Sequence, residues 1–247
     1  MRRFFTEPEN IENNRAKIIE DAPHIERVLR LEEGCEIILF DGTGYEYIAE
    51  LESVSSKECV ALIKEKKFSE LEPKTRVVVY QGIPKSGKME SIIQKSVELG
   101  VLEIVPTAMD RCVSKIENPK KGAEKVKRWN KIAVEAAKQC GRGCIPKVSE
   151  PVSFKDAIDR MLKSQLALMP YEVIGHLGGQ SIKEVLGKKK FLDISVIIGP
   201  EGGFSDAEAE YAKEKGIFLV GLGKRILRTE TVSSAVLAMI MYENDEV

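Results

Sequence analysis

Two glycine-bearing segments of this 247-residue chain stand where main-chain atoms could hold a ligand. The first, residues 197–204, reads Ile-Ile-Gly-Pro-Glu-Gly-Gly-Phe and continues an apolar, strand-like run. Ligands of open α/β sheets bind beyond the carboxyl ends of the strands, and glycine lacks the Cβ atom that would hold a ligand away from the backbone. The segment therefore predicts either a ligand-binding loop or a tight turn between a strand and a helix.

The second segment, residues 222–231, mixes apolar and ionic residues between a strand pattern and a helix pattern. Ile226 and Leu227 could line an adenine slot. Arg228 and Glu230 stand near the start of the helix, where the helix dipole and free N–H groups favour anionic partners. The alternative is that these two side chains form a salt bridge with each other and have no role in binding.

A third segment, Gly82-Ile-Pro-Lys-Ser-Gly-Lys88, has the spacing of a phosphate-binding P-loop. The next residue is Met89, however, whereas a P-loop needs Ser or Thr there to bind magnesium. No apolar strand downstream ends in the aspartate that would hold the same ion. Nucleotide hydrolysis is therefore a weak alternative, and Lys85 and Lys88 are interpreted as surface or RNA-facing cations.

The cysteines and histidines do not predict a metal site. Five cysteines form no Cys-x-x-Cys pair, and His24 and His176 are the two histidines. An odd number of cysteines without a secretion signal favours reduced thiols in a cytoplasmic protein. No apolar stretch approaches the roughly 18 residues of a membrane span.

Charge is unevenly distributed along the chain. The net charge is -1, yet residues 110–131 hold eight Lys or Arg against three Asp or Glu, a surplus of five. Such a segment could bind phosphate, or it could be a solvated helix face.

Residues 1 to about 70 show short β-like patterns. Residues 37–40 and 45–49 flank the turn Asp41-Gly-Thr-Gly44, which predicts a hairpin. Residues 59–63 predict another strand and residues 23–30 a short helix, and together these pieces fit a small β-barrel. The polar stretch 69–74 predicts a boundary between a domain at 1–71 and a second domain at 74–247.

After the boundary, β-branched runs alternate with helical patterns, which is typical of a parallel sheet flanked by helices, an α/β fold. The expected strands are 76–80, 101–105, 165–169, 194–199 and 217–220. One helix should end at Gly100, a longer one should carry Trp129, and another should begin at the Ser205-x-x-Glu208 capping box. The last helix is expected over 231–242. Its inward face is predicted to hold Val232, Ala235, Val236, Met239 and Ile240.

These residues together carry a resemblance that runs nearly from end to end. It includes Arg3-Phe-Phe, Phe40-Asp-Gly-Thr-Gly, Gln94-Lys, Arg111, Glu135-Ala-Ala, Gly141-Arg, Pro146 and the segments 199–204 and 222–231. The chain resembles the RsmE family of the SPOUT superfamily, whose members methylate N3 of a uridine in 16S ribosomal RNA. Cys112 and Val232 stand where the family pattern has smaller residues such as Ser and Ala.

The resemblance implies a PUA-like, RNA-binding β-barrel at 1–71 and a SPOUT methyltransferase domain at 74–247 whose C-terminal part forms a trefoil knot. It implies a homodimer acting on 16S ribosomal RNA or the small ribosomal subunit. S-adenosylmethionine would lie among three loops. Their residues are Leu168, Met169 and Pro170; Gly199, Pro200, Glu201 and Gly202; and Leu222, Gly223, Ile226, Leu227 and Arg228.

Roles in the reaction follow from the chemistry of uracil. N3 must lose a proton before it can attack, and Arg228 is expected to stabilise the negative charge that develops. Glu230 would orient Arg228 or accept the proton, although a carboxylate beside an arginine is a poor base. RNA backbone contacts are expected from Arg2, Arg3, Arg30, Lys95, Arg111 and Arg142. The rival interpretation is a ribosome-associated RNA-binding module without catalysis.

Overall fold

The computed structural model describes residues 1–85, 87–114, 118–172 and 180–246. The chain forms two compact units. The N-terminal unit consists of Met1–Glu72 together with Ala137–Ile145, and the C-terminal unit consists of Pro73–Ala136 and Pro146–Val247. The segment 137–145 is therefore part of the N-terminal unit, although it is more than 60 positions away from residue 72 in the sequence.

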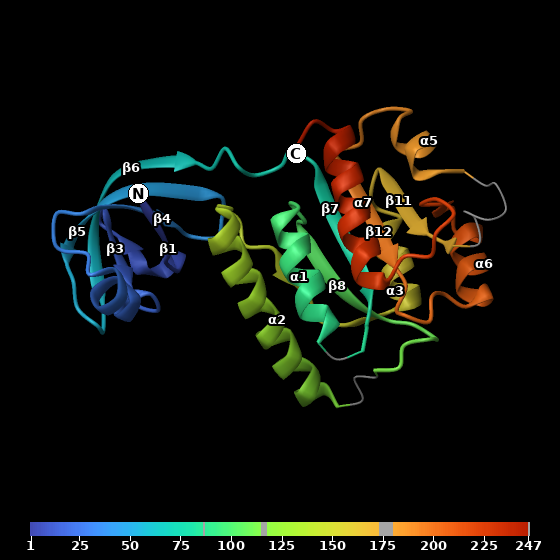
Figure 1. Cartoon of the computed structure of the whole chain (residues 1–247), viewed down its shortest axis with the longest axis horizontal. Coiled ribbons are helices and arrows are strands. Elements are labelled where there is room, and N and C mark those ends of the chain that lie inside the picture. Colours follow the sequence, from blue (N-terminus) through green and yellow to red (C-terminus); the bar gives the residue numbers. More distant parts are fainter. Residues whose placement is uncertain (86, 115–117, 173–179, 247) are drawn as a thin grey trace. The chain divides into compact units, whose positions relative to one another are not determined.

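The N-terminal unit is built on one six-stranded sheet in the order β1-β4-β5-β6-β3-β2 (Figure 1). Its strands are β1 (Arg2–Phe5), β2 (Ile11–Glu12), β3 (Arg15–Ile18), β4 (Glu36–Phe40), β5 (Tyr45–Ser53) and β6 (Cys59–Phe68). The predicted hairpin is confirmed, because β4 and β5 pair antiparallel. The predicted short helix is a π-type turn, η2 (His24–Leu29), and a 3-10 turn, η1 (Pro8–Asn10), precedes β2.

The sheet curls on itself, as the expected barrel requires. Register shifts between β5 and β6 occur at Ile48/Ala49 and Leu51/Ser53, where bulges increase the twist. The Thr6 hydroxyl, directly after β1, donates to the Lys17 carbonyl of β3 at 2.6 Å, although β1 and β3 lie near opposite ends of the strand order. The apolar faces of the curled sheet enclose a core that includes Ile37, Leu39, Ala49, Leu51 and Ala61, all nearly without exposed surface.

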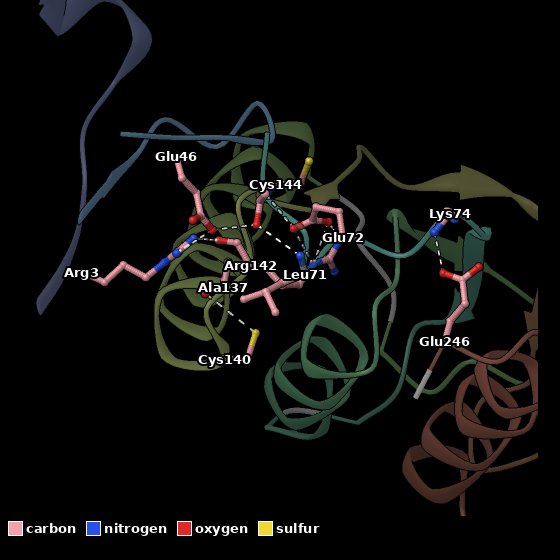
Figure 2. Close-up of polar contacts among 11 residues, drawn as sticks. Arg3, Glu46, Leu71, Glu72, Lys74, Ala137, Cys140, Arg142, Cys144 and Glu246 are labelled. Carbon is pink, nitrogen blue, oxygen red and sulfur yellow. Dashed lines mark hydrogen bonds and ion pairs between the residues drawn. The ribbon is translucent and has the colours of Figure 1, made fainter. Parts of the chain in front are cut away.

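A buried ion pair and a side-chain hydrogen bond attach the segment 137–145 to this unit (Figure 2). The Arg142 guanidinium lies 2.8 Å from the Glu72 carboxylate, and both side chains are less than a tenth exposed. Arg3 donates to Glu46 at 2.8 Å and to the Arg142 carbonyl at 2.9 Å. Ser69 donates a further hydrogen bond to Glu46 at 2.7 Å. Arg3 and Arg142 are therefore engaged in holding the unit together.

The C-terminal unit contains a seven-stranded parallel sheet in the order β10-β8-β7-β12-β11-β13, with β9 paired to β8. Its strands are β7 (Arg76–Gly82), β8 (Glu103–Ala108), β9 (Lys147–Val148), β10 (Val152–Ser153), β11 (Leu166–Pro170), β12 (Asp193–Ile198) and β13 (Phe218–Val220). All five predicted strands are confirmed within two residues at most ends. The two-residue strands β9 and β10 were not predicted, because two residues show no period.

Helices connect these strands (Figure 1). They are α1 (Lys88–Glu98), α2 (Pro119–Cys140), α3 (Phe154–Met161), α5 (Ile182–Leu186), α6 (Asp206–Glu214) and α7 (Thr229–Glu243). The capping box before α6 is confirmed, since Ser205 and Glu208 bond each other's backbone amides. Gly100 and Gly216 follow α1 and α6 in the left-handed conformation that ends helices. None of the described helices is long and apolar enough to cross a membrane.

The prediction for α7 was wrong in two respects. The helix begins at Thr229, two residues before the expected start, so that Arg228 is its N-cap residue. Val236 and Ile240 are buried as predicted, but Ala235 is half-buried and Met239 is exposed. The helix is apolar around most of its circumference, so hydrophobic period alone could not distinguish its two faces.

Candidate functional site

A cavity of about 510 Å³ lies at the carboxyl ends of β11 and β12, between these strands and the start of α7. Its lining residues are Lys88, Pro170, Glu172, Ile198, Gly199, Pro200, Glu201, Gly202, Gly203, Phe204, Ile226, Leu227, Arg228, Thr229 and Val232. A smaller cavity of about 70 Å³ shares five of these residues and adds Tyr171, Leu222, Gly223 and Arg225. The two glycine-bearing segments singled out in the sequence thus meet in space at one site.

Most residues expected to bind a ligand line one of these cavities, but two do not. Leu168 and Met169 have no exposed surface and line neither cavity. The reason is that β11 is hydrogen-bonded to β12 on one side and β13 on the other, so its side chains belong to the core and only Pro170 reaches the cavity. We therefore expect no side-chain contact between a ligand and Leu168 or Met169.

Close main-chain packing shapes the loop after β12. A Cβ atom at Gly82, the last residue of β7, would lie 2.7 Å from the Pro200 nitrogen, a distance that real Cβ atoms do not show. A Cβ at Gly199 would lie 3.2 Å from the Gly203 carbonyl carbon. Glycine at these positions lets β7 approach the loop, and lets the two ends of the loop approach each other, at distances that a Cβ atom would prevent.

A buried polar network fixes the two segments relative to each other. The Thr229 hydroxyl donates to the Gly199 carbonyl at 2.7 Å and accepts from the Gln81 amide at 2.9 Å. The Ser233 hydroxyl donates to Gln81 at 3.0 Å. Gln81, Thr229 and Ser233 are at most 4% exposed, so these bonds satisfy groups that water cannot reach. The network joins the end of β7, the loop after β12 and the first turns of α7.

Sequence reasoning missed this network. The signals that could have indicated it were a glutamine directly after the apolar run 76–80 and a serine inside an apolar helix. Polar residues inside apolar elements need hydrogen-bond partners, but the sequence does not say which partners they find.

Lys88 is a second residue whose place sequence reasoning did not anticipate. We interpreted it as a surface or RNA-facing cation, but it lines the cavity. Its ammonium lies 3.3 Å from Glu201 and 3.3 Å from Glu230. Glu201 also accepts a hydrogen bond from the Lys85 backbone amide at 3.2 Å. The ion pair of Glu230 is therefore formed with Lys88 and not, as one interpretation had it, with Arg228.

These ion pairs shift the pKa values of the groups involved. Burial alone would lower the pKa of Lys88, but Glu201 and Glu230 outweigh it and raise that pKa above its usual value. The pKa of Glu230 is lowered, first by its own backbone amide and then by the charges of Lys88 and Arg228. Burial would raise the pKa of Glu201, yet its backbone amide and Lys88 lower it. Both carboxylates are therefore ionised at neutral pH.

Arg228 lies at the start of α7, where this helix borders the cavity. It is exposed, lines the larger cavity and caps the N-terminus of α7 in an extended conformation. Its charge contributes to keeping Glu230 ionised. A cation at the rim of a cavity, beside the free N–H groups of a helix start, can stabilise negative charge on a bound group.

The P-loop alternative loses its support in the structure. Met89, at the position where the motif requires a hydroxyl, is 3% exposed and packs in the core. Ser86 lies outside the described residues, as does His176. Within the described ranges no three His, Cys, Asp or Glu side chains gather as metal ligands would.

Comparison with known proteins agrees with this geometry. A family model described as an RNA methyltransferase domain matches residues 71–241, and one described as an RNA methyltransferase PUA domain matches residues 20–64. The ribosomal RNA small subunit methyltransferase E of Bacillus subtilis (strain 168) is 36% identical to this chain, over 92% of this chain and 89% of the relative. That of Aquifex aeolicus (strain VF5) is 32% identical, over 87% and 89%.

A solved structure is similar over nearly the whole chain. The crystal structure of a ribosomal RNA small subunit methyltransferase E from Neisseria gonorrhoeae bound to S-adenosyl methionine matches with a TM-score of 0.84 at 30% identity, over 98% of this chain and 97% of that one. This chain belongs to the ribosomal RNA small subunit methyltransferase E family. The resemblance seen in the sequence is confirmed, and so is the α/β fold with an N-terminal PUA-like domain. The trefoil knot stays a prediction.

The six residues that the family resemblance led us to expect in contact with RNA differ in their exposure to solvent. Arg2, Arg30, Lys95 and Arg111 are exposed. Arg111 donates to the Gly202 carbonyl at 3.1 Å and so lies beside the larger cavity.

Arg3 and Arg142 differ from these four residues, because both form ion pairs within the N-terminal unit. Arg142 is 5% exposed and is paired with Glu72, while Arg3 is paired with Glu46. A phosphate that paired with Arg142 would have to displace the buried Glu72, and one that paired with Arg3 would compete with Glu46, so we leave both out of the set proposed to contact RNA.

The basic segment 110–131 lies largely on α2. Of this segment, Val126 and Trp129 are buried. Exposed lysines occupy the outer side of the helix at 120, 121, 125, 127 and 131. Arg128 pairs with Glu90 of α1 at 3.1 Å. The helix thus has an apolar inner face and a cationic outer face, as a surface that binds phosphate would have.

Proposed function

We propose that this protein transfers the methyl group of S-adenosylmethionine to N3 of a uridine in 16S ribosomal RNA. The observation that carries the proposal is the cavity of about 510 Å³ in which segments 199–204 and 226–229 meet, in a chain of the methyltransferase E family. The relative from Neisseria gonorrhoeae is bound to S-adenosyl methionine. By this proposal the cavity is the cofactor site.

The residues present fit such a cofactor. The volume lies within the roughly 300–1,000 Å³ usual for small-molecule sites. Ile226, Leu227 and Val232 supply apolar surface for an adenine ring. Glu172 supplies negative charge for a ligand that carries a sulfonium and an ammonium group, whereas the charge of Glu201 is paired with Lys88. A wall of glycine main chain leaves room for the ligand to lie against N–H and C=O groups.

The chain itself has to supply position and charge. S-adenosylmethionine, when bound, supplies a methyl group that is already electrophilic. Uracil N3 carries a proton at neutral pH, and once the proton leaves, negative charge spreads over N3 and two carbonyl oxygens. Arg228, exposed at the cavity rim, is the donor proposed to stabilise that charge.

Glu230 is proposed to act by position and not as the base. Its lowered pKa means that it holds a proton weakly, and its ion pair with Lys88 would have to be disrupted if it became neutral. Its charge lies in the first turn of α7, one residue beyond Thr229 and two beyond Arg228. We propose that it helps to orient the helix start that carries Arg228.

RNA engagement is proposed to involve both units. The PUA match supports an RNA-binding role for the N-terminal unit, where Arg2 and Arg30 are exposed. In the C-terminal unit the proposed backbone contacts are Lys95, Arg111 and the outer lysines of α2. Because N3 is hidden in a paired uridine, the target base would have to leave its helix to enter the cavity.

We further propose that the protein acts in the cytoplasm as a homodimer. The exposed side of α7 carries Met239 and Tyr242, the latter 76% exposed. A helix that is apolar all round is normally buried on both sides. A second copy of the chain packed on this face of α7 would cover it.

Ligand binding separates the candidate functions. Titration calorimetry of the purified protein with S-adenosylmethionine and, separately, with ATP should give heat of binding for the first ligand alone. Binding of ATP alone would favour the hydrolase, and binding of neither would favour an RNA-binding module without catalysis.

The substrate is tested on ribosomal RNA. Mass mapping of modified uridine in 16S ribosomal RNA from cells lacking this protein should reveal one missing methyl group. The purified enzyme with labelled S-adenosylmethionine should restore it, and a fully methylated RNA in those cells would contradict the proposal.

A further inference from the structure

The P-loop-like segment has no part in the function proposed so far, yet its residues Gly82 and Lys85 contact the cavity loop. Gly82 approaches the Pro200 main chain more closely than any residue with a Cβ atom could. The Lys85 amide donates to Glu201, and Gly87 adopts the left-handed conformation, with φ of +88°, just before α1. This segment thereby delivers Lys88, the first residue of α1, into the cavity.

The Lys88 ammonium stands between carboxylates from two different walls of the cavity. Glu201 belongs to the loop after β12 and Glu230 to the first turn of α7, and each has an oxygen 3.3 Å from the ammonium. The three side chains are between 20% and 33% exposed. The Oε2 atom of Glu230 is buried and accepts no hydrogen bond within the described structure, so the Lys88 charge compensates it.

Without that ammonium, the two carboxylates would share one partly buried region with no cation between them. Like charges in such a region repel, and the repulsion acts on the loop and on the helix start that carry them. The hydroxyl of Thr229 bonds the same loop from the neighbouring position, so the ion pairs and the hydrogen bond hold one junction.

We propose that Lys88 is a positioning residue of the methyl-transfer site, whose ammonium holds loop 199–204 and the first turn of α7 at the spacing that the cavity requires. The proposal rests on the proposed function, because it assigns Lys88 to the site in which S-adenosylmethionine is proposed to bind. Lys88 acts through Glu201 and Glu230, and through them on the place of Arg228.

The test compares three variants of the full chain. Lys88→Met removes the bridge, and Lys88→Arg keeps a cation that can pair with both carboxylates. Lys85→Met removes an exposed cation of the same segment but leaves the bridge intact, so it reports loss of charge alone. Affinity for S-adenosylmethionine is measured by calorimetry without RNA, and kcat and KM by methyl transfer to 16S ribosomal RNA.

Lys88→Met should lower kcat and cofactor affinity, with kcat falling about tenfold or more, because small displacements of catalytic groups have effects of that size. Lys88→Arg should restore most of both quantities. Lys85→Met should have an effect several times smaller than Lys88→Met.

The pH profile distinguishes positioning from loss of fold stability. Lys88 lowers the pKa of both Glu201 and Glu230, while Arg228 and the backbone amides also lower that of Glu230. In the wild type, acidification breaks the bridge by neutralising these carboxylates. Without Lys88 there is no bridge to break, both carboxyl pKa values rise, and protonation relieves the repulsion between the two carboxylates. The loss of activity at acid pH, the acid limb of the profile, should therefore be weaker in Lys88→Met than in the wild type. A residue that only stabilised the fold would lower the melting temperature and leave this acid limb in place.

Glu201→Gln keeps the proposal testable if Lys88→Met fails to fold. It removes one of the two ion pairs, and it should reduce cofactor affinity and raise KM for the cofactor. Lys88→Arg should bind the cofactor better than Glu201→Gln does. In a folded Lys88→Met protein, the effects of the two substitutions should not add, because both break the same bridge.

Two results overturn the inference. One is a Lys88→Met protein with the cofactor affinity, kcat and acid limb of Lys85→Met, and the other is a Glu201→Gln protein that behaves as the wild type. A wild-type protein that binds no S-adenosylmethionine would instead contradict the proposed function itself, and the two failures are therefore distinguishable.

Discussion

At the scale of single residues, the charges at the cavity are divided between two tasks. Lys88 is engaged by two carboxylates, whereas Arg228 is exposed at the rim and lines the cavity without a carboxylate within ion-pair distance among the described residues. An arginine in that position can direct its N–H groups at a bound base without breaking an existing pair. This difference is why we assign charge stabilisation to Arg228 and positioning to Lys88.

Replacement of Arg228 tests the assignment. Arg228→Ala should lower kcat by about a hundredfold or more, the size of effect seen when one charge-stabilising donor is removed from a transition state. Affinity for S-adenosylmethionine should change much less, since the base and not the cofactor carries the developing charge. The measurement is single-turnover methyl transfer, with calorimetry on the same protein. An unchanged rate of methylation would refute the role.

At the scale of elements, α7 connects the site to the sheet. Its first residue, Thr229, joins Gly199 and Gln81 through one hydroxyl, so the helix start, the loop and β7 share a buried junction. Because the hydroxyl both donates and accepts, no apolar side chain of the same shape can replace it.

Thr229→Val should therefore destabilise the protein by about 1–3 kcal/mol, the usual effect of leaving buried polar groups unpaired. It should also weaken S-adenosylmethionine binding, because the loop loses its attachment to α7. Thr231→Val is the matched control, since Thr231 is exposed one half-turn further along the same helix. Denaturant unfolding gives the free energy of unfolding, and calorimetry gives the affinity for S-adenosylmethionine. Equal values for the two variants would contradict the role of the Thr229 hydroxyl in holding the loop.

In the N-terminal unit, the attachment of segment 137–145 depends on the ion pair of Arg142 and Glu72. Arg142→Met leaves the Glu72 carboxylate buried without its cation, and it should cost about 3–5 kcal/mol of unfolding free energy. Arg30→Gln, at an exposed position, should cost under about 0.5 kcal/mol and instead reduce the salt dependence of RNA binding. An Arg142→Met protein of wild-type stability with weakened RNA binding would restore Arg142 to the RNA-contacting set.

At the scale of the whole molecule, the exposed face of α7 predicts the state of association. Met239→Glu combined with Tyr242→Glu should convert a dimer to a monomer in sedimentation equilibrium, because two charges would be buried in an apolar interface. Leu162→Glu, at a comparably exposed apolar residue at the end of α3, should leave the association unchanged. A wild-type protein that is monomeric at micromolar concentration would contradict the dimer.

Local patterns in the sequence were enough for many of the elements and for part of the site, although they predicted neither the strands β1, β2 and β3 nor the helices α3 and α5. Strand runs, the Ser205–Glu208 capping box and the glycines that end helices depend on neighbours a few residues apart, and they were confirmed. The family resemblance implied that the segments at 199–204 and 222–231 meet around one cofactor, and in the fold both segments follow strands of one parallel sheet, whose carboxyl ends lie at the same edge. The cavity lies at that edge.

Tertiary structure alone decided which charged and polar residues are paired. Arg142 and Glu72 stand 70 positions apart, and Gln81 and Thr229 stand 148 apart, so no periodicity could connect them. Lys88 was interpreted from the sequence as a surface or RNA-facing cation. Its ion pairs with the distant Glu201 and Glu230, which the sequence could not indicate, place it in the wall of the cavity. Hydrophobic period records which side of an element is buried, whereas the partner of a buried charge depends on which distant segment the fold brings beside it.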